Sequence, residues 1–126
     1  MPDLTGTWRS VYDYPCSSRG RTLSSEHDVT VTEDGNTVRV RSYGSPSRVM
    51  IDLEAAEVED RVVLTGTWRE HTDPQGHYKG TAYHGAVQFV LSEDGSTMSG
   101  AWVGHDRALT GMNTGSWELE RVPEGS

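Results

Sequence analysis

The sequence predicts an all-β fold, a single eight-stranded antiparallel up-and-down β-barrel that spans residues 1–126. Apolar and polar residues alternate along most of the chain, which is the period of a strand with one buried face. Turn-forming residues such as Asp34-Gly35-Asn36 separate the alternating segments, and no stretch of ten residues has helical spacing. Closing a small sheet into a barrel removes its exposed edges, and a two-sheet sandwich is the alternative.

Eight alternating segments between the turn signals give the expected strands. Their ranges are residues 4–14, 22–32, 37–44, 48–55, 60–71, 77–91, 96–104 and 113–122. A barrel of this size either fills with side chains or holds one small ligand, so the fold alone leaves both options open.

The first strand carries an inward row of alternating residues: Leu4, Gly6, Trp8, Ser10, Tyr12 and Tyr14. Trp8, near its start, predicts a closed barrel end. Ser10, Tyr12 and Tyr14 then approach the other end, beside a loop at residues 15–21. Polar aromatic side chains near an opening are typical of a small-ligand pocket, but tyrosine hydroxyls bonded within a core give the same pattern.

The second and third strands form a predicted hairpin about the turn at residues 33–36. This hairpin pairs Val31 with Val38, Val29 with Val40 and His27 with Ser42 on the inner face, and Asp28 with Arg41 on the outer face. An inward histidine in a row of valines needs a polar partner. His27, with Ser42 opposite, is therefore either satisfied within the core or available for ligand contact or proton transfer.

The fifth and sixth strands form another predicted hairpin about residues 73–76, whose sequence Asp-Pro-Gln-Gly suits a turn at every position. It places Trp68 opposite Thr81, Gly66 opposite Tyr83, Leu64 opposite Gly85 and Val62 opposite Val87 in an inward row. Residues 69–71 (Arg-Glu-His) then fall near the exposed tip. A third turn, at 93–95, connects the sixth and seventh strands.

The pentapeptide Leu-Thr-Gly-Thr-Trp occurs twice, at residues 4–8 and 64–68. The residues after the two copies diverge at once, which argues against an internal duplication. We interpret the repeat as one packing demand met on two strands, with glycine where strands approach closely and tryptophan to fill the interior.

Four motifs in order resemble the calycin superfamily, and within it the avidin/streptavidin branch. They are Gly6-Thr7-Trp8, the run of residues 61–66 (RVVLTG), the run of residues 98–104 (MSGAWVG) and the run of residues 113–117 (NTGSW). The resemblance implies a barrel with a ligand in its interior, closed where a basic side chain, here Arg121, packs across Trp8.

The resemblance also places residues at the ligand positions of that branch. Phe89 and Trp117 stand where two ligand-flanking tryptophans would be, Met98 where another would be, and Ser10 where the family has an asparagine. Because this polar set is incomplete, we do not expect biotin as the ligand.

Residues 77–122 also resemble a domain that follows helix-turn-helix modules in actinobacterial regulators, which implies a sensory role. The chain contains no helix-turn-helix, so DNA binding is not carried over.

Composition excludes several function classes. The formal net charge of −8 repels phosphate backbones, so we expect no nucleic-acid partner. The longest apolar stretches have four or five residues, too few to cross a membrane, and no secretory leader is visible, so we expect a cytoplasmic protein. Cys16 is the only cysteine, and His71 and His77 lie on different strand faces, so no metal or other cofactor is expected. No nucleophile elbow or phosphate loop is present.

We therefore predict small-molecule binding in the barrel interior, by a sensor or carrier of an uncharged or weakly anionic metabolite. The predicted ligand-binding residues are Ser10, Tyr12, Tyr14, Arg19, His27, Ser42, Tyr83, Phe89 and Trp117. Arg19 belongs to loop 15–21, expected as a lid that reaches an anionic edge of the ligand. An enzyme such as a cyclase or isomerase is the alternative, and a filled barrel that only contacts other proteins is a third.

An uncharged outer row also predicts contact between copies of the chain. Its members are Val63, Thr65, Thr67, Ala82, Ala86 and Gln88. Such a face is unusual in a protein of this net charge and is a candidate homo-oligomer interface.

Overall fold

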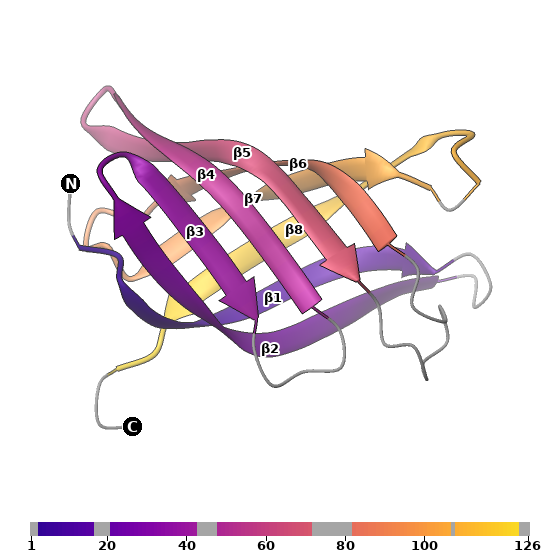
Figure 1. The fold of residues 1–126 in the computed structure, drawn as a ribbon, viewed down its shortest axis with the longest axis horizontal. Coiled ribbons are helices and arrows are strands. Elements are labelled where there is room, and N and C mark those ends of the chain that lie inside the picture. The colour runs from indigo at the N-terminus through magenta and orange to yellow at the C-terminus, as the bar shows by residue number, and fades with distance from the viewer. Residues whose placement is uncertain (1–2, 17–20, 43–47, 72–81, 107, 124–126) are drawn as a thin grey trace.

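The computed structural model describes residues 3–16, 21–42, 48–71, 82–106 and 108–123, and these form a closed antiparallel barrel (Figure 1). The eight strands are β1 (Gly6–Cys16), β2 (Arg21–Asp34), β3 (Thr37–Ser42), β4 (Arg48–Val58), β5 (Arg61–His71), β6 (Ala82–Leu91), β7 (Thr97–His105) and β8 (Met112–Arg121). Each strand pairs with the next, and β8 pairs with β1. The predicted all-β, eight-stranded up-and-down barrel is confirmed, and it agrees with a calycin-like fold.

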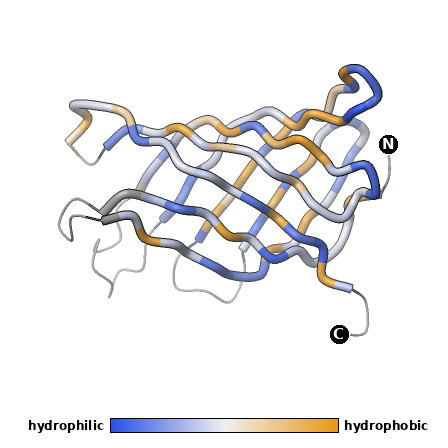
Figure 2. Tube along the Cα trace, turned by 180° about the vertical axis from the view of Figure 1, so that it is seen from behind, coloured by the Kyte–Doolittle hydropathy of each residue, from blue (hydrophilic) through white to orange (hydrophobic). Residues whose placement is uncertain are grey.

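The two ends of the barrel differ. At one end, which we call the turn end, lie the start of β1, the end of β8 and the connections β2–β3, β4–β5 and β6–β7 (Figure 1). The opposite end, which we call the loop end, is where β1, β3, β5 and β7 finish. Alternating hydrophilic and hydrophobic residues along the strands (Figure 2) give every strand one inward and one outward row.

The β2–β3 hairpin has a different register from the predicted one. Gly35 has a φ of 61°, and the turn contains only Gly35 and Asn36, so Asp34 pairs with Thr37. The twist of such a two-residue turn matches that of the strands, and glycine is favoured at its first position because that position needs a positive φ. The predicted four-residue turn was therefore wrong.

The shorter turn moves each cross-strand pair by two residues. Val31 pairs with Val40, Val29 with Ser42, and His27 with Ser10 of β1. The predicted His27–Ser42 pair and the predicted Asp28–Arg41 pair are both wrong. Arg41 forms an ion pair with Asp52 at 2.7 Å, whereas Asp28 lies 3.7 Å from Arg9.

The β5–β6 register also differs. Trp68 pairs with Gly85, Gly66 with Val87 and Leu64 with Phe89, each four residues from the predicted partner. The predicted turn at residues 73–76 lies outside the described residues. Both register errors are even numbers of residues, so the described side chains in the predicted inward rows of these hairpins still point inward.

The turn end is closed by the predicted contact between Trp8 and Arg121. These residues pair across β1 and β8, and the Arg121 guanidinium carbon lies 4.8 Å from the centre of the indole. The Trp8 indole N–H donates to the Leu4 carbonyl at 2.9 Å, and the whole residue is buried. Arg121 also donates to the carbonyls of Asp3 and Thr5, and these bonds hold residues 3–5, just before β1, against the end of β8.

The two Leu-Thr-Gly-Thr-Trp copies perform different packing tasks. Trp68, in the second copy, lies over Gly85 and Gly104, and its indole N–H donates to the Val103 carbonyl at 3.2 Å. A Cβ on Gly85 would lie 2.5 Å from the indole nitrogen, so only glycine leaves room for the ring. The Trp8 indole instead bonds to the Leu4 carbonyl just before β1, and a Cβ on Gly6 would meet no atom closer than 3.5 Å, so the interpretation of the repeat as one packing demand on two strands was wrong.

Candidate functional site

The loop-end half of the barrel interior holds a connected cluster of aromatic rings, which we call the aromatic floor: Tyr12, Trp68, Trp102 and Trp117. Tyr12 and Trp117 have ring centroids 4.8 Å apart, and Trp68 lies 5.4 Å from Trp102 and 6.1 Å from Trp117. All four residues are buried. Trp68 and Trp102 were not predicted as site residues, although both share the inward phase of their strands.

Each indole N–H of the floor is bound to a protein acceptor. The Trp102 N–H donates to the Asp13 carbonyl at 2.9 Å, passing over Gly115, and the Trp68 N–H donates to the Val103 carbonyl. The Trp117 N–H donates to the Ser10 hydroxyl at 2.8 Å. The indoles are therefore held in fixed positions, and their N–H groups are not available as donors to another molecule.

Three predicted site residues have roles within the protein. Ser10 is fully buried and accepts the bond from Trp117. The Ser42 hydroxyl accepts a bond of 2.7 Å from the Val49 amide and so joins the end of β3 to the start of β4. Phe89 is fully buried, 6.1 Å from Trp117 in an edge-to-face arrangement, and supports that indole from within the core.

His27 is half-buried beside the floor, and its ring meets Tyr12 edge-on at 6.1 Å. The Nε2 atom is buried, and within the part of the chain that the structure describes it has no hydrogen-bond partner. Burial lowers the pKa of His27, with a smaller opposing effect from Asp28. The imidazole is therefore held towards its neutral form.

Glu70 is the residue that the sequence prediction missed. The tip of β5 was expected to be exposed, but only Arg69 and His71 are exposed and Glu70 is half-buried. Its Oε2 atom accepts a hydrogen bond of 2.6 Å from the Tyr12 hydroxyl. The phase of β5 was the available signal, because Glu70 is two residues after the inward Trp68.

The Tyr12–Glu70 bond crosses the barrel interior, because β1 and β5 are four strands apart and lie on opposite walls (Figure 1). Burial raises the pKa of Glu70, and the bond from Tyr12 opposes that rise. Burial first, and then the charge of Glu70, raise the pKa of Tyr12 far above its usual range. Tyr12 therefore remains a hydroxyl donor at every ordinary pH.

The remaining predicted residues lie around this bond or outside the described part of the chain. Tyr14 is half-buried, 5.9 Å from Tyr12. Tyr83 pairs with Glu70 across β5 and β6 and stacks on His105 at 6.0 Å. Arg19 and residues 17–20 lie outside the described residues, but the predicted loop at residues 15–21 was too long, because β1 continues to Cys16 and β2 begins at Arg21, which pair with each other.

The described residues contain no group of three His, Cys, Asp or Glu side chains that could hold a metal ion.

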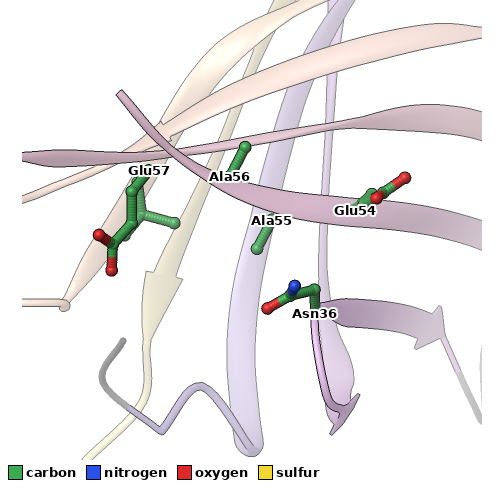
Figure 3. A pocket seen from close by; sticks show the side chains of 6 residues that line it. Asn36, Glu54, Ala55, Ala56 and Glu57 are labelled. Atoms are coloured by element: carbon green, nitrogen blue, oxygen red, sulfur yellow. The ribbon is translucent and has the colours of Figure 1, made fainter. Parts of the chain in front are cut away.

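A groove of about 440 Å³ occurs at the turn end, lined by Asn36, residues 54–57 and Val62. Asn36 points towards Ala55 there, and the carboxylates of Glu54 and Glu57 point away from each other (Figure 3). None of the predicted ligand-binding residues lines this groove.

Within the described ranges, no helix is long and apolar enough to pass through a bilayer. No family model matches the chain, and a comparison with curated proteins finds no similar sequence.

Proposed function

We propose that this protein binds a small, flat, partly aromatic molecule at the loop end of its barrel, as a sensor or carrier. The observation that carries the proposal is the buried Nε2 of His27, which has no partner among the described residues and lies beside the aromatic floor. A buried polar atom without a partner costs about 1–3 kcal/mol, and a polar group of a ligand would remove that cost.

Two further features support this function. The bonded indole N–H groups hold the aromatic side chains of the loop-end half in place, and a rigid site loses little entropy on binding. The resemblance to calycins, and within them to the avidin/streptavidin branch, favours an interior ligand. The resemblance to the domain of actinobacterial regulators favours a sensory role.

The test is a search for a retained ligand by native mass spectrometry of protein purified from its host, followed by titration of the ligand-free protein. Three of the four tryptophans belong to the aromatic floor, so binding should change the intrinsic fluorescence. His27→Ala and Tyr12→Ala should each weaken affinity by about tenfold, the equivalent of one lost hydrogen bond to a buried group. His84→Ala, on the exposed outer face of β6, is the matched control. Unchanged affinity in both site variants would place the pocket elsewhere.

A barrel isomerase or cyclase is a second candidate, favoured by one observation. The Tyr12 hydroxyl, the Glu70 carboxylate and the His27 imidazole bring a donor and two acceptors to one part of the interior. Conversion of the retained molecule by the purified protein would favour the enzyme, and its release unchanged would favour the binder.

A further inference from the structure

The Glu70 carboxylate has one described partner, the neutral Tyr12 hydroxyl. Among the side chains that the structure describes, the inward rows of the loop-end half include no Lys or Arg, because Arg9, Arg48 and Arg69 are all exposed. The inward Arg121 is at the turn end, against Trp8. A carboxylate withdrawn from water without a cationic partner is unfavourable, and a cation that reaches it gains more than it would at the surface.

The hydrogen-bonding groups of the site also favour a ligand that donates hydrogen bonds. The three indole N–H groups of the floor and the Tyr12 hydroxyl already donate to protein atoms. The Glu70 carboxylate keeps acceptor capacity beyond its bond to Tyr12, and a neutral His27 imidazole carries one donor and one acceptor nitrogen. The one charged group of the described inward rows at this end is thus an acceptor, which suits a ligand that donates hydrogen bonds and disfavours an anion.

The aromatic faces favour a positive charge as well. A cation over a tryptophan or tyrosine face is attracted by the negative face of the ring, and tryptophan gives the strongest attraction. Tyr12 joins the two features, because its ring belongs to the floor and its hydroxyl contacts Glu70. The net charge of −8 adds a long-range attraction for cations approaching the protein.

We propose that the loop-end site takes an organic cation, a protonated or methylated amine carried on an aromatic ring, with its ammonium group at Glu70 and its ring against the aromatic floor. This inference rests on the proposed function. It reverses the charge expected from the sequence, which was uncharged or weakly anionic, because that expectation did not include Glu70 among the inward residues.

Three probes with the same ring and different charge test this inference: 2-phenylethylamine, 2-phenylethanol and phenylacetate. Isothermal titration calorimetry at neutral pH and low salt measures their affinities for the full chain. The amine should bind at least about tenfold more tightly than the alcohol, and phenylacetate most weakly, because a hydrogen bond to a charged group is worth about 1.5–3 kcal/mol.

Glu70→Gln then identifies the group responsible, because it keeps the shape and an acceptor for Tyr12 but removes the charge. It should weaken the amine by about tenfold and leave the alcohol within about twofold. Glu54→Gln, on the exposed face of β4, removes the same charge elsewhere and should change neither affinity. Far-ultraviolet circular dichroism confirms that each variant is folded.

The outcomes separate this inference from the proposed function. Binding of the alcohol or phenylacetate with no preference for the amine overturns the cation inference and leaves small-molecule binding in place. Equal amine affinities in Glu70→Gln and the unaltered chain also overturn it. If none of the three probes binds at millimolar concentration, the cation inference fails, and a retained ligand of another charge class in native mass spectrometry would still support the proposed function.

Discussion

Tyr12 and Glu70 are 58 residues apart in the sequence, and a hydrogen bond of 2.6 Å joins them across the interior of the barrel. The Tyr12 ring lies 4.8 Å from Trp117 and meets His27 edge-on at 6.1 Å, so the bond connects a carboxylate to the aromatic floor and to a histidine whose Nε2 has no described partner. This combination of a buried acid and aromatic faces is the chemical basis of the proposed site.

The energy of the Tyr12–Glu70 bond can be isolated with a double-mutant cycle. Tyr12→Phe removes the donor and leaves the buried carboxylate unpaired, so the free energy of unfolding at neutral pH should fall by about 1–3 kcal/mol. The same substitution in a Glu70→Gln background should be less damaging, because no charge is left without a donor. Urea denaturation measures both. Equal losses in the two backgrounds would show that the hydroxyl does not stabilise Glu70.

Glu70 should also make stability depend on pH. Burial raises its pKa in the folded state above the ordinary value of 4.5. A raised carboxyl pKa means that its favourable contribution is complete below the unfolded value and is lost as the pH rises through the folded value. Glu70→Gln should therefore stabilise the protein at neutral pH and lose this advantage below the ordinary value. A stability advantage of Glu70→Gln that persists unchanged at acidic pH would contradict a raised pKa of Glu70 as its cause.

The fold could be predicted from the sequence because a strand period of two survives errors in register. Both hairpins were misplaced by an even number of residues, so the inward positions of His27, on β2, and Trp68, on β5, were still correct. The pairs themselves could not be predicted, because they depend on turn geometry, such as the positive φ of Gly35.

The site was predictable only in part for a related reason. Tyr12 and His27 stand out as polar residues in inward rows, but Glu70 is flanked by two charged or polar neighbours and was assigned to an exposed tip. Its bond to Tyr12 spans opposite walls of the barrel, and such a contact follows from closure rather than from any local pattern.

The glycines beneath the indoles should be intolerant of a methyl group. A Cβ on Gly115 would lie 2.2 Å from the Asp13 carbonyl oxygen and 2.7 Å from the Trp102 indole nitrogen. Gly115→Ala should therefore cost about 1–3 kcal/mol of unfolding free energy, as overpacked sites do. Gly111→Ala is the matched control, since its nearest contact is 3.4 Å away. Thermal denaturation compares the two, and similar melting temperatures would contradict the close packing of Trp102.

Closure of the turn end should depend on Trp8. Trp8→Ala removes a fully buried indole and its contact with Arg121, and we expect a loss of about 3–5 kcal/mol in unfolding free energy. Chemical denaturation provides the measurement. A loss under about 1 kcal/mol would be far below that of a large core truncation and would show that Trp8 does not close the barrel.

The outer face of β5 and β6 is the predicted contact between copies of the chain, and Ala101 of β7, which pairs with Gln88, extends it. Its central residues, Thr65, Thr67, Ala86, Gln88 and Ala101, are exposed and uncharged, whereas the outer face of β1 and β2 carries Arg9, Glu26 and Asp28. Two copies with a formal charge of −8 repel each other least through a face without charge, so this face is the most favourable one for self-association. We expect light scattering to report a dimer or larger assembly at micromolar concentration, and Ala101→Glu to convert it to a monomer by placing like charges at the contact. Thr30→Glu, on the outer face of β2, should leave the assembly intact. A monomer at high micromolar concentration in the unaltered protein would rule out this interface.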